Sequence, residues 1–138
     1  MALHRLTEIY KNRSVSDWIS SINDLNHRMV ILKNNQTNIS TETLIWALTY
    51  GVVPFMILGL MYDDKMYVTK GGHEISVIQK FVQNEITIQL HTLKPSRLIN
   101  YKALEREQQE NIQYSIIPAV YCRVDTKQEL NKLLETII

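Results

Sequence analysis

The chain has 138 residues, of which 45% are hydrophobic and 21% are charged, and its formal net charge is +1. This length and composition fit one globular domain with a real core. The near-zero charge argues against a generally basic nucleic-acid coat and against a disordered acidic tail, although it leaves room for a local basic groove. Cys122 is the only cysteine, which excludes an intramolecular disulfide and a cysteine-based metal cluster.

The first half of the chain predicts two helices that begin at serines. The expected elements, in order, are an N-terminal arm over 1–13, a helix from Ser14 or Ser16 to about Asn23, a strand over Met29–Leu32, a polar loop over Lys33–Asn38 and a helix from Ser40 to Tyr50. A serine at a helix start can accept a hydrogen bond from the unpaired N–H groups of the first turn. Gly51 can end the second helix, since glycine adopts the left-handed conformation without strain.

The apolar run from Leu44 to Met61 is the one segment whose length approaches that of a membrane span. Thr49, Gly51 and Pro54 interrupt it, so a helix followed by a buried strand over Pro54–Leu60 explains it better. The N-terminus shows no apolar core long enough for a secretory signal. We therefore expect an intracellular protein with no membrane partner, in the cytoplasm or, if viral, in the virion.

The second half predicts a mixed succession of strands and helices. The expected elements, in order, are a hairpin turn over Asp63–Lys65, a short strand over Met66–Val68, a helix from His73 to about Val82, a strand over Glu85–Leu90, a turn over Lys94–Ser96, a polar helix over Lys102–Gln113 with Leu104 and Ile112 inward, a strand over Ile116–Val124 and a last helix capped by Asp125. Pro118 inside an apolar strand predicts an edge position or a bulge. Together these elements predict an α+β fold, a single compact domain over 1–138 with a small mixed β-sheet flanked by helices.

Metal and serine-nucleophile chemistry find little support in the sequence. The four histidines show no HxxxH or HxH spacing, so we expect no metal site. No Gly-x-Ser-x-Gly elbow marks a serine nucleophile. Asp63 and Asp64 are better explained as turn residues than as metal ligands. Cys122 lies in an apolar run and is expected to be a buried core thiol.

The most informative stretch is Tyr67–Phe81, which reads as a strand, a tight glycine turn and a helix. Gly71 and Gly72 allow a sharp reversal, because glycine tolerates positive φ. A turn that opens a helix leaves backbone N–H groups unpaired and can hold an anion or a phosphate. On local pattern alone, however, an ordinary polar turn is the favoured interpretation.

This stretch resembles the signature of the ParB/sulfiredoxin-like superfamily, and most of all that of the N-terminal domain of GmrSD-type restriction systems. The family pattern is Asp-Gly-Gln-Gln-Arg-Leu-Thr-Thr-Ile, followed two residues later by Phe. Gly71, Ile75, Ser76, Ile78 and Phe81 stand at its glycine, leucine, first threonine, isoleucine and phenylalanine. The resemblance implies a ParB/sulfiredoxin-like fold in which Ile75, Ile78 and Phe81 face the core.

The chemistry of the signature is altered in this chain. Lys70 stands where the family has Asp, Gly72 and His73 replace the two Gln, and Glu74 replaces Arg. In the family these residues are linked to nucleotide hydrolysis or DNA nicking, since Arg can clamp a phosphate and Asp can orient a metal or a water. Glu74 would repel a phosphate, and Lys70 cannot bind a cation as Asp does. We therefore expect no catalytic residues in this turn.

Two functional hypotheses follow from the resemblance. The first is a non-catalytic ParB/GmrS-like domain that acts as a binding or assembly module, in a viral or phage particle or a DNA-associated complex, with a protein partner or a homo-oligomer and no cofactor. The second is a divergent nucleotide-dependent protein that binds or nicks DNA. Its nucleotide or nucleic acid would be held by the turn residues Lys70, Gly71, Gly72, His73, Glu74 and Ser76. A composition rich in Ile, Asn and Lys fits viruses, phages and low-GC bacteria alike.

Overall fold

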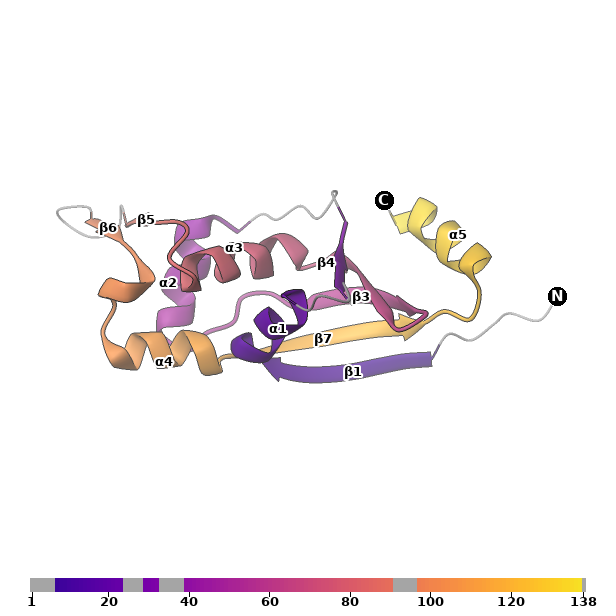
Figure 1. Cartoon of the computed structure of the whole chain (residues 1–138), viewed down its shortest axis with the longest axis horizontal. Coiled ribbons are helices and arrows are strands. Elements are labelled where there is room, and N and C mark those ends of the chain that lie inside the picture. Colours follow the sequence, from indigo (N-terminus) through magenta and orange to yellow (C-terminus); the bar gives the residue numbers. More distant parts are fainter. Residues whose placement is uncertain (1–6, 24–28, 33–38, 91–96, 138) are drawn as a thin grey trace.

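The computed structural model of the protein describes residues 7–23, 29–32, 39–90 and 97–137 (Figure 1). In chain order its elements are β1 (Thr7–Ser14), α1 (Val15–Ile22), β2 (Met29–Ile31), α2 (Thr41–Thr49), β3 (Ile57–Tyr62), β4 (Lys65–Lys70), α3 (Gly72–Val82), β5 (Ile88–Leu90), β6 (Arg97–Ile99), the 3₁₀ helix η1 (Tyr101–Ala103), α4 (Arg106–Tyr114), β7 (Ile116–Arg123) and α5 (Lys127–Ile137). The loop expected over Lys33–Asn38 and the turn expected over Lys94–Ser96 lie outside the described residues.

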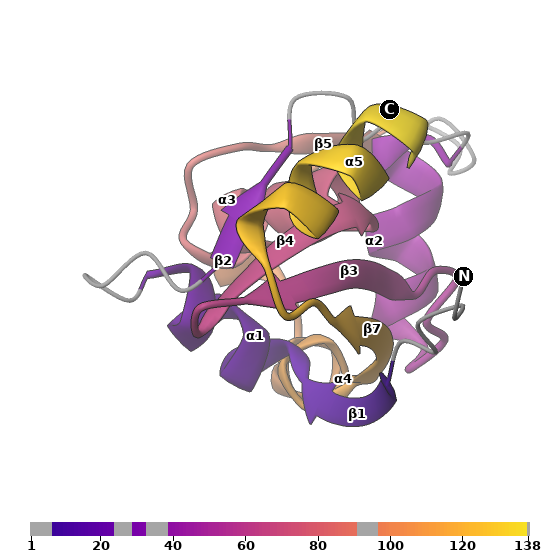
Figure 2. The same ribbon diagram turned by 90° about the vertical axis from the view of Figure 1, so that its right-hand side faces the viewer.

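Five strands form one mixed sheet in the order β1-β7-β3-β4-β2, and β5 pairs with β6 in a separate two-stranded sheet. β7 is antiparallel to β1 and parallel to β3, whereas β4 is antiparallel to β3 and parallel to β2. The predicted α+β fold with a small mixed sheet is therefore confirmed. Helices flank the sheet, as Figures 1 and 2 show.

The sheet separates two hydrophobic layers. The main core lies between the sheet and helices α1, α2, α3 and α4, and its fully buried members include Trp18, Leu48 and Phe81. Helix α5 packs on the opposite face, where Leu130 joins a smaller cluster of buried residues (Figure 2). Cys122 is half-buried and packs against this second cluster, so the expectation of a buried core thiol holds only in part.

Strand β1 is the longer of two strands that the sequence pattern did not predict, the other being the three-residue β6. Residues 7–13, expected to belong to an N-terminal arm, form this strand together with Ser14 and pair with β7 along its whole length. Lys11 and Arg13 alternate with Tyr10 and Asn12, so neither side of the segment shows an apolar face. The strand conformation comes instead from pairing with β7, and the charged side chains suit the outermost strand of a sheet.

Pro118 lies in β7, an inner strand of the sheet. The partner strand β1 accompanies all eight residues of β7, but β3 begins opposite Ala119. Pro118 therefore precedes the stretch that has neighbours on both sides, and its missing N–H removes no bond to β3. The predicted edge position is wrong for the strand as a whole and holds for this first part of it.

Helix α1 begins as predicted and is fixed to the sheet at two points. The Ser14 side chain caps it by accepting a hydrogen bond from the Asp17 N–H at 3.2 Å. The Val15 N–H donates to the Ser115 carbonyl at 2.9 Å, and the buried Trp18 indole N–H donates to the Ile117 carbonyl at 3.1 Å. The start of α1 is thereby tied to the start of β7.

The apolar run after Ser40 forms a helix and then a buried strand, as predicted. Ser40 caps α2 by accepting from the Thr43 N–H at 3.1 Å, and Gly51 follows its end with φ of 76°. The strand begins at Ile57 rather than at Pro54. In the described ranges of the chain, no helix is both long and apolar enough to cross a membrane.

The helix after the glycine turn packs as the family resemblance implies. Ile75, Ile78 and Phe81 of α3 are each fully buried. The Phe81 ring meets Tyr101 of η1 edge to face, with ring centroids 6.0 Å apart. Burial raises the pKa of Tyr101, although a hydrogen bond from Gln113 opposes this.

The second half departs from the prediction in the segments before and within α4, in the β5–β6 pair, and at the start of α5. There Thr126 Oγ1, and not Asp125, accepts a hydrogen bond from the Glu129 N–H at 3.1 Å. The helix expected from Lys102 is divided into η1 and α4, because Glu105 and Gln108 form a capping box that starts α4. Ile112 is nevertheless fully buried and Leu104 partly buried, as predicted. The strand expected over Glu85–Leu90 is reduced to its last three residues, those that pair with β6.

Phe81→Ala should lower the free energy of unfolding by roughly 3–5 kcal/mol, the usual cost of emptying a buried aromatic site. Urea denaturation followed by circular dichroism measures this. Leu98→Ala is the matched control, since Leu98 is 69% exposed and its truncation should change stability by less than about 0.5 kcal/mol. Equal urea midpoints for the two variants would contradict the burial of Phe81 in the packing of α3.

Candidate functional site

The glycine turn is closed against its own chain. β4 ends at Lys70, and Gly71 precedes α3 with φ of 86°, a conformation that favours glycine. A side chain at Gly71 would overlap the carbonyl oxygen of Met56 and come within 3.1 Å of the Ile57 Cα atom. The turn therefore rests on the segment that leads into β3, and its backbone requires glycine for two separate reasons.

The predicted turn residues divide into a buried and an exposed group. Gly71, Gly72 and Glu74 are buried, whereas Lys70 and His73 are exposed. Ser76 is partly exposed, one turn of α3 further on. Glu74 is only 5% exposed, and its Oε2 atom has no hydrogen-bond partner among the residues that the structure describes. The geometry is that of a packed turn with two polar side chains at its rim, and phosphate binding there stays a prediction.

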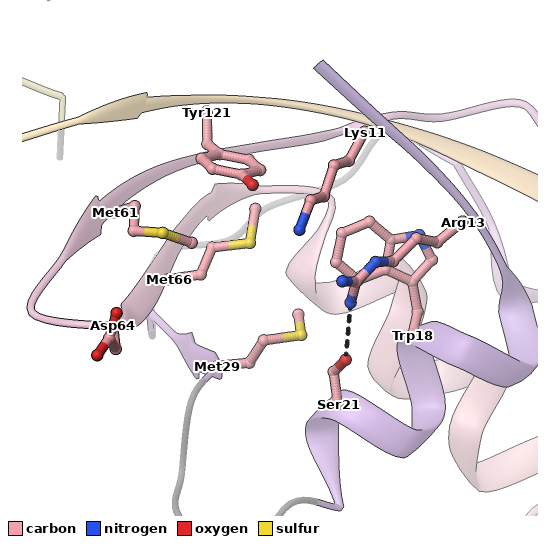
Figure 3. A pocket seen from close by; sticks show the side chains of 9 residues that line it. All are labelled: Lys11, Arg13, Trp18, Ser21, Met29, Met61, Asp64, Met66 and Tyr121. Atoms are coloured by element: carbon pink, nitrogen blue, oxygen red, sulfur yellow. Dashed lines mark hydrogen bonds between the residues drawn. The ribbon is translucent and has the colours of Figure 1, made fainter. Parts of the chain in front are cut away.

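A pocket of about 420 Å³ lies at the opposite end of β4, between β1, α1 and the β3–β4 hairpin (Figure 3). We call it the β1–α1 pocket, and its lining residues are Lys11, Arg13, Trp18, Ser21, Met29, Met61, Asp64, Met66 and Tyr121. These residues belong to none of the sites expected from the sequence. The lining comes from six elements and one turn, so no continuous motif marks the pocket.

Two cations reach the pocket from β1. Lys11 and Arg13 are two residues apart on one strand, so both side chains project from the same face of the sheet. Figure 3 shows both pointing into the pocket. Lysine and arginine alternating in a strand is the one sequence signal that could have indicated the site, but it becomes visible only once β1 is known to be a strand.

Arg13 is held in place by two contacts with α1. Its Nη1 atom donates a hydrogen bond to Ser21 Oγ at 3.3 Å, and its guanidinium carbon lies 5.5 Å from the centre of the Trp18 ring. A cation over an indole face is attracted by the ring's negative charge density. Trp18 is itself fixed by its bond to β7. Arg13 is therefore positioned before any ligand arrives.

Three methionines form the apolar middle of the pocket. Met29, Met66 and Met61 lie opposite one another on β2, β4 and β3, and so form a row across the sheet. Gly59 keeps β3 close to β4 beside this row, since a Cβ atom there would lie 2.8 Å from the Tyr67 carbonyl oxygen and 3.2 Å from the Met66 Cε atom. Tyr121 of β7 adds an aromatic side chain that is only 3% exposed.

Asp64 supplies the acidic end of the pocket. It lies in the two-residue turn between β3 and β4, where Asp63 and Asp64 both have positive φ, of 52° and 60°. This is the pattern of a type I′ hairpin turn, which confirms the hairpin predicted there. Figure 3 places Asp64 across the methionines from Lys11 and Arg13, so the pocket is cationic at one end and anionic at the other.

Metal chemistry gains no support from the described residues. No three His, Cys, Asp or Glu side chains among them gather closely enough to hold a metal ion. Of the histidines, only His73 lies in the described ranges, and it is exposed. The β1–α1 pocket can instead bind through charge, hydrogen bonds and apolar contact.

Comparisons of the chain with protein-family models, with curated proteins and with solved structures find no match. The mixed-sheet α+β fold is established by the structure itself. The resemblance to the ParB/GmrS family stays a prediction. Function has to be inferred from the closed turn and the β1–α1 pocket.

Gly71→Ala should destabilise the domain more than Gly51→Ala, although both glycines have positive φ. At Gly51 a Cβ atom would meet no atom of the described residues within 4 Å, so only the backbone strain of about 1–2 kcal/mol is expected. At Gly71 the overlap with Met56 should add roughly 1–3 kcal/mol more. Chemical denaturation of both variants measures the difference. Equal losses would show that the turn is open rather than packed on β3.

Proposed function

We propose that this domain is a non-catalytic binding module of the ParB/GmrS N-terminal type, and that its recognition site is the β1–α1 pocket. The observation that carries the proposal is the fixed position of Arg13, bonded to Ser21 and lying over Trp18 at the edge of a partly apolar pocket. A pre-positioned cation loses little conformational entropy when an anion binds. The module would hold an anionic group of a protein partner.

The glycine turn supports the non-catalytic part of the proposal. An arginine at position 74 would need to reach a phosphate, but this position is almost fully buried and holds a carboxylate. Lys70 is exposed at the end of β4, where the family signature places an acidic residue. At position 74, neither charge nor access therefore favours phosphate chemistry.

The charges of the pocket support an anionic ligand. Lys11 and Arg13 contribute two positive charges against the single negative charge of Asp64. The arginine can form paired hydrogen bonds with a carboxylate or a phosphate, because its guanidinium presents several donors in one plane. The methionines between the two ends favour a ligand that carries an apolar group next to its charge.

A small carboxylate with a branched apolar tail, 4-methylpentanoate, should bind the pocket. Titration into protein labelled with ¹³C at the methionine methyl groups should shift the signals of Met29, Met61 and Met66. Met56 is an internal control, since it is 37% exposed and does not line the pocket. The neutral amide of the same acid should bind at least about tenfold more weakly, because it lacks the charge that Arg13 and Lys11 recognise. Equal binding of acid and amide would contradict an anion-recognition site.

The purified protein should show no nucleoside triphosphatase activity and no nicking of supercoiled plasmid. Phosphate release and plasmid conversion are measured with magnesium and with manganese. Robust turnover that Lys70→Ala or His73→Ala abolishes would replace the binding module by the nucleotide-dependent alternative.

A further inference from the structure

We infer that the occupant of the β1–α1 pocket is an extended acidic peptide of a partner protein, with a carboxylate side chain against Lys11 and Arg13 and a neighbouring aliphatic side chain among the methionines. This inference rests on the proposed function and adds the class of ligand. It draws on four features of the pocket, which are its thioethers, its covered aromatic rings, its balance of charges and its size.

The row of Met29, Met66 and Met61 suits an aliphatic side chain. A methionine has three rotatable bonds and a polarizable sulfur, so a group of them can adapt to apolar partners of different shape. Surfaces that accept varied peptides use methionine in this way. Met29 and Met61 are partly exposed at the pocket, whereas Met66, between them in the row, is buried with 5% exposure.

The aromatic rings of the pocket are unsuited to a nucleobase. Nucleotide sites commonly stack the base on an accessible aromatic face. Here Arg13 already lies over the Trp18 ring, which is 2% exposed, and Tyr121 is 3% exposed. A base entering the pocket would therefore meet thioethers rather than a stacking surface, and this favours a peptide over a nucleotide.

The charges favour a carboxylate over a phosphate. Arg13 donates one N–H to Ser21 and keeps other guanidinium donors that can meet a carboxylate. Asp64 at the far end would repel a doubly charged phosphate more strongly than a singly charged carboxylate. The same aspartate can accept a main-chain N–H, which an extended peptide supplies and a small fatty acid does not.

The size of the pocket agrees with this occupant. A volume of about 420 Å³ lies within the range of small-ligand sites and has room for a few side chains rather than a folded domain. A second copy of the chain is a poor occupant of this edge, since pairing β1 with another β1 would bring Lys11 and Arg13 of both copies together. An acidic segment makes the opposite, favourable pairing.

The test compares three blocked tetrapeptides, Ac-Gly-Glu-Leu-Gly-NH2, Ac-Gly-Gln-Leu-Gly-NH2 and Ac-Gly-Glu-Ser-Gly-NH2, with adenosine monophosphate. Methionine-methyl NMR of the full chain reports binding through Met29, Met61 and Met66, with Met56 as the internal control. The Glu-Leu peptide should shift the three pocket signals. The Gln-Leu and Glu-Ser peptides should each bind at least about tenfold more weakly, since each lacks one of the two recognised groups.

Arg13→Gln should weaken binding of the Glu-Leu peptide by about tenfold or more and leave binding of the Gln-Leu peptide unchanged. Lys102→Gln is the matched control, because Lys102 is an exposed lysine of η1 that does not line the pocket. Ser21→Ala should give a smaller loss, since it frees Arg13 without removing its charge. An unchanged amide spectrum of each free variant shows that the fold is kept.

Other outcomes overturn the inference in distinct ways. If 4-methylpentanoate binds and no peptide does, the anion site stands and the peptide class is wrong. Tighter binding of adenosine monophosphate than of the Glu-Leu peptide would make the pocket a nucleotide site. Pocket shifts that depend on protein concentration without ligand would point to a second copy. If none of the anions binds, both the inference and the proposed function are wrong.

Discussion

Trp18 is the residue on which both the core and the pocket depend. Its buried indole donates to the Ile117 carbonyl at 3.1 Å and so joins α1 to β7, which lie 99 residues apart at this bond. The same ring carries the Arg13 guanidinium at 5.5 Å, while Ser21, one turn further along α1, holds that guanidinium from the side. Removal of a buried tryptophan typically costs about 3–5 kcal/mol, so the packing that stabilises the domain also fixes the cation of the pocket.

The two ends of strand β4 lead to the closed glycine turn and to the partly open β1–α1 pocket. Its last residue leads into the glycine turn, where the backbone packs on Met56 and Ile57. Its first residues form the hairpin with Asp64 and contribute Met66 to the pocket. The turn at one end is thus closed by packing, whereas the hairpin end is partly open and lined by flexible methionine side chains, as the proposed binding site requires. The alternation of side chains along the sheet allows this division, because Met66 and Val68 face the main core while Tyr67 faces α5.

Local sequence patterns predict much of the fold but little of the β1–α1 pocket. Ser14 and Ser40 marked two helix starts, and the apolar spacing of Ile75, Ile78 and Phe81 marked the buried face of α3, because caps and periodicity act within one segment. Strand β1 carries no such signal, since its conformation depends on a partner more than a hundred residues away. The pocket was missed for the same reason, because Lys11 and Arg13 meet the methionines only through the order of strands in the sheet.

The glycine turn is closed by steric contacts of its backbone, and not by the charges of its side chains. Lys70 and Glu74 carry charges opposite to those of the ParB/GmrS pattern that this stretch resembles. In the structure Gly71 lies against the backbone of the segment that leads into β3. Glu74 is 5% exposed, and its Oε2 atom finds no hydrogen-bond partner in the described part of the chain. Replacing Glu74 by arginine would place a longer side chain and an unpaired cation in this buried space, at a desolvation cost of several kcal/mol. Restoring the family's charges would therefore not by itself reopen the turn, because the closure is made by backbone contacts that no change of charge removes.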